Sequence, residues 1–264
     1  RLSAHIVSPV KDHLVAEALG WTPGTNGPVR AAAVQMTLPV RPTKDELAVH
    51  LDALKDAVRG KIVLVGAHQR VLVTFNDPPE RRDDRDVLQI LNAPPAAPAR
   101  GTPAGPTQKP QPEANRVLSN TQLNEQLYQF LLTNGALLRV SDAGRDHGQI
   151  RAFANPTYDP AKAIPTVVLR NEDYGRISRL MAGGRAVELE ATIVNQTYPD
   201  GKVQHNVIAE IPGTDKAQEV VMLGGHLDSW HAATGATDNA IGVSTMYEAI
   251  RILQTIGVKP RRTI

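Results

Sequence analysis

The chain is 264 residues long, with 41% hydrophobic and 21% charged residues, a composition that excludes a wholly disordered protein. Lysine and arginine number 29 against 27 for aspartate and glutamate, and a net charge of +2 predicts no nucleic-acid partner and no anionic membrane surface. Cysteine is absent, which excludes disulfides, zinc–thiolate sites and cysteine nucleophiles. No stretch reaches the roughly 18 consecutive apolar residues of a bilayer span, so we expect no membrane span in this chain.

Both ends of the sequence have the pattern of an internal cut. The chain begins at Arg1 without an initiator methionine or a charged and then apolar leader segment. It stops at Ile264, where residues 261–264 have the pattern of a strand that is just beginning. We therefore expect this sequence to be a piece of a longer protein.

Residues 30–193 have the pattern of an α/β module with short connections. A helix is predicted over 44–58, because its leucines recur at helical spacing and Thr43 with Glu46 forms the pattern of a capping box. The same spacing predicts helices at 120–134 and 171–181. Short β-branched runs bounded by turn residues predict strands at 60–66, 136–140, 164–169 and 187–194.

A proline-rich stretch at 77–116 interrupts this module. Nine of the 20 prolines of the chain fall between Pro78 and Pro112. Such a composition buries too little apolar area to offset the entropy of ordering it, so we expect a flexible excursion. Within it, the apolar island 87–91 is expected to pack back as a short strand or turn.

The pattern changes at Asn206. Alternation predicts a strand over 206–211, and the nearly continuous apolar run 219–223 predicts a strand covered on both faces. A loop over 224–238 follows, and then a strong helix that ends before Gly257. The loop therefore lies at the carboxyl end of a buried strand, which is where α/β enzymes place their chemistry.

That loop carries three residues whose chemistry suits a metal site. A neutral imidazole such as that of His226 binds zinc well when an acceptor orients its other ring nitrogen. Asp228 lies two residues further on, so an extended backbone points it the same way as His226. Asp238 precedes the helix, and its two oxygens could bridge two metal ions about 3.5–4 Å apart.

Each of these residues also has a simpler interpretation. His226 and Asp228 could form a surface hydrogen-bond pair, and Asp238 could be a helix cap. His231 could be a third ligand, but its spacing from His226 fits no ligand pattern on a helix. The combination on one strand, loop and helix is what favours the metal site.

Longer matches around these residues resemble a known family. The stretch VMLGGHLDSW at 221–230, followed by GATDNA at 235–240 and Gly242, resembles the metal-binding signature of co-catalytic dinuclear zinc exopeptidases. These are aminopeptidases and glutamate carboxypeptidases that share a fold with transferrin receptor. Residues 58–65 and 164–174 resemble the protease-associated domain that many of these enzymes carry as an insertion, and residues 19–25 resemble the lead-in to it.

The resemblance implies an architecture and a set of ligands. The fold would be α/β, with a truncated α/β/α zinc-exopeptidase domain at 194–264, an inserted protease-associated domain at 30–193 and a lead-in at 1–29. His226 would bind one of two zinc ions, Asp238 would bridge both, and Asp228 would orient His226. The family also uses a Glu–Glu pair, a further carboxylate and a final histidine. After Asp238 this chain holds Glu248 as its single carboxylate and no histidine.

The function implied is hydrolysis of terminal peptide bonds by a two-metal hydroxide mechanism. An aminopeptidase that is secreted or periplasmic and acts on peptide substrates fits best, and this fragment alone is expected to be inactive. The alternatives are carboxypeptidase or dipeptidase specificity, or a receptor-like binding protein that keeps the fold without catalysis. A Glu–Glu pair in the parent sequence would distinguish an enzyme from a receptor.

Overall fold

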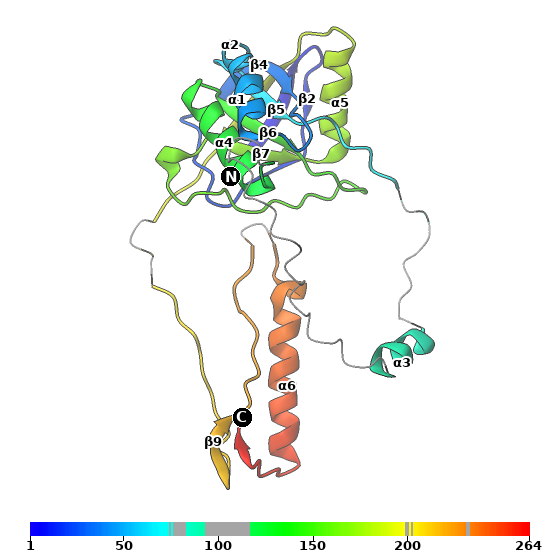
Figure 1. Ribbon diagram of the computed structural model, residues 1–264, viewed down its shortest axis with the longest axis vertical. Coiled ribbons are helices and arrows are strands. Elements are labelled where there is room, and N and C mark those ends of the chain that lie inside the picture. The colour runs from blue at the N-terminus through cyan, green and yellow to red at the C-terminus, as the bar shows by residue number, and fades with distance from the viewer. Residues whose placement is uncertain (74, 76–82, 93–116, 199–200, 202, 231–232) are drawn as a thin grey trace, which may run out of the picture. The chain divides into compact units, whose positions relative to one another are not determined.

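The computed structural model describes residues 1–73, 75, 83–92, 117–198, 201, 203–230 and 233–264. It divides into two compact units, Arg1–Asn195 and Gln196–Ile264, which are drawn in Figure 1. Among the helices of these described residues, none is long and apolar enough to cross a membrane. Most of the proline-rich stretch at 77–116 lies outside the described residues, so its predicted flexibility stays a prediction.

The first unit is built on an eight-stranded mixed sheet with the order β2-β1-β8-β4-β5-β6-β7-β3. The central strands β4 to β7 run parallel to one another, and the remaining neighbours pair antiparallel. Strand β3 also contacts β1, so the sheet curls back on itself. The strands are β1 Leu2–Ser8, β2 Asp12–His13, β3 Ala16–Ala18, β4 Val29–Met36, β5 Ile62–Val65, β6 Leu138–Asp142, β7 Thr166–Leu169 and β8 Glu188–Ile193.

Helices cover both faces of this sheet, and each face has its own apolar core. Figure 1 shows α1 (Lys44–Asp52) and α4 (Asn120–Thr133) on one side and α5 (Asn171–Ala182) on the other. The alternation along β5 distributes its side chains accordingly: Ile62 and Leu64 pack in the core that includes Tyr174 and Ile177 of α5. Val63 packs in the opposite core with Leu47, Leu51, Leu127 and Leu131 of α1 and α4.

The predicted elements of this unit are confirmed within a few residues, with one helix divided in two. The helix predicted at 44–58 ends at Asp52, and a short second helix, α2 (Lys55–Val58), begins after Leu54. The capping box is present, because the Thr43 side chain accepts a hydrogen bond from the Glu46 N–H and the Glu46 carboxylate accepts one from the Thr43 N–H.

One part of the first unit differs from the sequence-based expectation. The island at 87–91 lies inside a helix, α3 (Asp84–Asn92), where a strand or turn was expected. The Asp83 carboxylate accepts a hydrogen bond from the Arg85 N–H and so begins the helix, and the acidic first turn favours its N-terminus. Residues 1–29 supply β1 to β3 of this sheet, in which β1 pairs with β8 and buries Ala4 and Ile6, and their assignment as a lead-in stays a prediction.

The second unit consists of extended segments, two paired strands and one long helix. Strand β9 (Lys216–Val220) pairs parallel with β10 (Arg262–Thr263), and α6 (Ile241–Thr255) lies between them in the chain. The strand expected at 206–211 is not formed, because only Ile211 finds a backbone partner, exchanging two hydrogen bonds with Ile264. Among the described residues of this unit, Thr263 is the single buried one.

Candidate metal-binding site

The candidate site lies in the loop and turn that connect β9 to α6. Gly235 has a φ of +72°, a conformation that glycine adopts without strain, and its α-carbon faces the Ser229 side chain. A turn at Ala236–Ala240 then leads into the helix, and Asp238 within it has a non-helical backbone. The Asn239 side chain packs closely on Gly242 in the first turn of α6, so a Cβ at position 242 would require that side chain to move.

The structure brings His226, Asp228 and Asp238 together. The Nε2 nitrogen of His226 lies 2.9 Å from Oδ1 of Asp238. The Nδ1 nitrogen of the same ring lies 3.0 Å from the backbone carbonyl oxygen of Asp228 and 3.1 Å from its carboxylate Oδ1. The two ring nitrogens therefore face two different aspartates, one on each edge of the imidazole.

The geometry does not support the alternative in which Asp238 caps the helix. The N-cap position of α6 is Ala240, and no side chain makes a capping hydrogen bond there. The Asp238 side chain contacts the imidazole of His226 instead. The Asp238–Asn239 peptide bond within this turn is cis.

The surrounding oxygens raise the pKa of the His226 imidazole above its ordinary value of 6.5. The largest cause is the hydrogen bond to the Asp228 backbone carbonyl, and partial burial opposes it. The negative charges of Asp228 and Asp238 act in the same direction as that hydrogen bond. All three side chains are at least half exposed, so a dissolved ion can reach them.

The donor set fits two ligands of a zinc ion. Imidazole nitrogen and carboxylate oxygen are ordinary zinc donors, and both bind at about 2.0–2.2 Å. A neutral imidazole that donates Nδ1–H to Asp228 keeps the Nε2 lone pair free on the side of Asp238. Among the described residues, no group of three or more histidine, cysteine, aspartate and glutamate side chains is placed to hold a metal ion. His231, considered above as a third ligand, lies outside the described residues.

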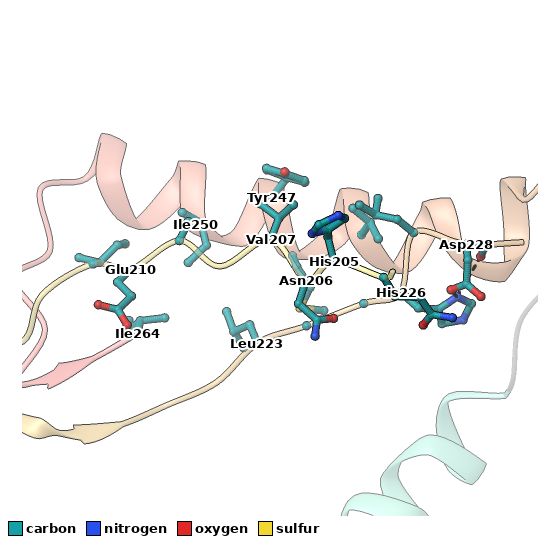
Figure 2. Close-up of a pocket in the computed structure, with 18 of the residues that line it drawn as sticks. His205, Asn206, Val207, Glu210, Leu223, His226, Asp228, Tyr247, Ile250 and Ile264 are labelled. Carbon is teal, nitrogen blue, oxygen red and sulfur yellow. Dashed lines mark hydrogen bonds and ion pairs between the residues drawn. The ribbon is translucent and has the colours of Figure 1, made fainter. Parts of the chain in front are cut away.

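A cavity of about 740 Å3 extends from His226 along one side of α6. Figure 2 shows His226 and Asp228 at one end of it and Glu210 with Ile264 at the other. His205 and Asn206 also line this cavity, and sequence reasoning did not select them. Their spacing from His226 matches no ligand pattern in the sequence. They reach the cavity because the extended segment that contains them lies along it in the folded chain.

Comparison with known proteins finds relatives of this part of the chain. Residues 206–264 match peptidase family M28. These residues, called the M28 segment below, are the part of the chain that is similar to that family. Carboxypeptidase Q of Mus musculus is 35% identical over 106 residues, which are 40% of this chain and 22% of that protein. Leucine aminopeptidase 2 of Trichophyton equinum is 37% identical over 90 residues, which are 33% of this chain and 17% of that protein.

Solved structures share the fold of the M28 segment and the preceding unit. A peptidase M28 precursor from Shewanella amazonensis SB2B superposes with a TM-score of 0.57 at 21% identity. A zinc aminopeptidase from Bacillus subtilis superposes with a TM-score of 0.52 at 15% identity. Each covers the whole of this chain, and the chain spans 50% and 47% of their lengths. These likenesses establish the mixed α/β fold, while the protease-associated character of residues 30–193 stays a prediction.

Proposed function

We propose that this chain carries the first part of the metal centre of a zinc-dependent exopeptidase that hydrolyses terminal peptide bonds. The observation that carries the proposal is the apposition of His226 Nε2 and Asp238 Oδ1 at 2.9 Å inside the M28 segment. The names of the relatives support a peptidase, because they include a carboxypeptidase, a leucine aminopeptidase and a zinc aminopeptidase. Secretion or a periplasmic location, expected above, belongs to the same proposal.

The roles of the residues follow from their contacts. His226 would bind one zinc ion through Nε2, and Asp238 would bind the same ion and bridge to a second. Asp228 would touch no metal, and would hold the imidazole in the tautomer that leaves Nε2 unprotonated. Bound zinc would supply water activation and polarisation of the scissile carbonyl. The negative charge of Asp228 would also make the neutral ring more basic, and so would strengthen Nε2 as a ligand of zinc.

Among terminal peptide bonds, we propose that the amino end of the peptide is the one attacked. The test is to assay the full-length product of the encoding gene on leucine p-nitroanilide, on an unblocked dipeptide and on the same dipeptide with a blocked amino group. An aminopeptidase hydrolyses the first two and leaves the blocked one intact. Hydrolysis of the blocked dipeptide would contradict this specificity and indicate a carboxypeptidase.

A matched set of variants tests the metal centre independently of specificity. His226→Ala and Asp238→Asn should each lower bound zinc and hydrolysis together, whereas Asp215→Asn, which breaks an exposed ion pair with Arg261, should change neither. A full-length protein that binds no zinc and hydrolyses none of the three substrates would overturn the proposal and favour the receptor-like alternative.

A further inference from the structure

Two histidines of the first unit lie side by side on neighbouring strands. His5 of β1 and His13 of β2 are direct cross-strand partners, and their ring centroids are 5.1 Å apart with an angle of 61° between the ring planes. His13 is exposed and His5 is half-buried. Figure 1 labels β2, which forms one edge of the sheet. Neither histidine belongs to the M28 segment.

The register explains why the two rings meet. The Leu14 N–H donates to the Ala4 carbonyl, so the Ala4–Leu14 pair is a hydrogen-bonded pair of the antiparallel ladder. The next pair, His5 with His13, is therefore a non-hydrogen-bonded pair, in which α-carbons approach to about 4.5 Å and side chains lie closest. Ala4 and Leu14 are buried in the core, so the alternation of the strands turns both histidines to the opposite, solvent face.

The separation of the rings matches that of two imidazoles on one metal ion. With metal–nitrogen distances of about 2.0–2.1 Å and a tetrahedral angle, the centroids of two ligating imidazoles lie about 5 Å apart. The two paired strands hold the β-carbons of the two histidines close together, so the backbone need not move when an ion binds. Glu190 of β8 is the cross-strand partner of His5 on its other side, and Arg30 of β4 faces Glu190 in turn.

We propose that His5 and His13 form a two-imidazole binding site for a divalent transition-metal ion such as Zn2+. The described residues contain no group of three protein ligands arranged for a metal. Two coordination positions are therefore left to water or to a donor from another molecule. The inference is independent of the proposed peptidase function, because the ion would bind on the solvent face of the first sheet.

Zinc chloride alone is the probe, in the 264-residue chain with His226→Ala and His231→Ala, so that the two imidazoles of the M28 segment do not contribute. Calorimetric titration should show one ion bound, and His5→Ala or His13→Ala should each weaken that binding at least tenfold because the chelate is lost. The double variant should bind zinc about as weakly as either single variant, because one substitution already removes the chelate. His50→Ala is the matched control, because His50 lies on α1 and contacts the Thr37 carbonyl.

The spectroscopic signature separates a chelate from scattered binding. Zinc should shift the ring nitrogen resonances of His5 and His13 together, with the same midpoint. Shifts of one ring without the other, or binding that His13→Ala leaves unchanged, would overturn the proposal. The melting temperature without zinc should change little in His13→Ala, since this side chain is exposed, and a large fall in that variant would assign the pair a packing role instead.

Discussion

The imidazole of His226 lies between two aspartates, with Nε2 2.9 Å from Asp238 Oδ1 and Nδ1 3.1 Å from Asp228 Oδ1. A neutral imidazole has one N–H, so it can donate to one of these carboxylates and not to both. Donation to Asp228, whose backbone carbonyl also accepts from Nδ1, leaves a lone pair and a carboxylate facing each other at Asp238. When the ring is neutral in this tautomer, the Nε2 lone pair and the Asp238 carboxylate are two electron-pair donors that face each other, and a metal cation can bind to both.

Replacing Asp238 by asparagine should weaken zinc binding by the full-length protein, and it should lower the affinity at both metal positions. A neutral amide binds a cation less well than a carboxylate, and its single carbonyl oxygen cannot bridge two ions with charge. Metal content after equilibrium dialysis measures this directly. If two zinc ions per chain remained bound at the wild-type affinity, the bridging role of Asp238 would be wrong.

Replacing Asp228 by asparagine should lower zinc affinity or activity about tenfold, the lower end of the 10–100-fold range for loss of a residue that orients a ligating histidine. The lower end is expected because the backbone carbonyl of Asp228, at 3.0 Å from Nδ1, is unaffected by the substitution. Titration with zinc at constant pH is the measurement, with Glu248→Gln on α6 as control. Direct coordination of Asp228 in a zinc-bound crystal structure would require a different ligand set.

Stability on the acid side should depend on Asp12. The hydrogen bond from the Arg176 guanidinium holds the pKa of this carboxyl below its ordinary value, with the His13 N–H and the charge of Arg176 acting in the same direction. A pKa lowered by folding contributes stability above the unfolded-state value, and that contribution disappears as the pH falls through the folded-state value.

We therefore expect Asp12→Asn to lower the melting temperature at pH 7 and to make it less dependent on pH below about 4. Thermal unfolding between pH 7 and pH 3 checks both parts. Glu125→Gln is the control, because the exposed side chain of this α4 residue makes no hydrogen bond or ion pair with the described residues. Parallel pH profiles for Asp12→Asn and the wild type would contradict the prediction.

Replacing Tyr128 by phenylalanine should destabilise the first unit by about 1–3 kcal/mol, because it leaves a buried acceptor without its donor. The Tyr128 hydroxyl donates to Asn155 Oδ1 at 2.6 Å, and both side chains are buried. Denaturant titration gives the free energy of unfolding. Tyr158→Phe is the matched control, since Tyr158 is 73% exposed, and an equal effect of the two substitutions would be inconsistent with this account.

The sequence alone determined the features that depend on near neighbours. The capping box of Thr43 with Glu46 and the helical spacing over 120–134 are contained within a few residues, so the helices could be predicted from the pattern. The same is true of the loop that carries His226, Asp228 and Asp238, because its residue types and their short spacing are chemical information in themselves. A helix begun by Asp83 was missed because its proline-rich surroundings outweighed a local signal.

Only the tertiary structure decided which segments pair. Nothing in residues 1–18 indicates that β1 lies against β8 or that His5 faces His13, because strand order depends on hydrogen bonds between distant segments and on burying one face of each strand. For the same reason residues 206–211 alternate in sequence without forming a strand: their backbone meets a partner only at Ile264. Periodicity shows which face of a segment is apolar, but the backbone partners that make it a strand are found only in three dimensions.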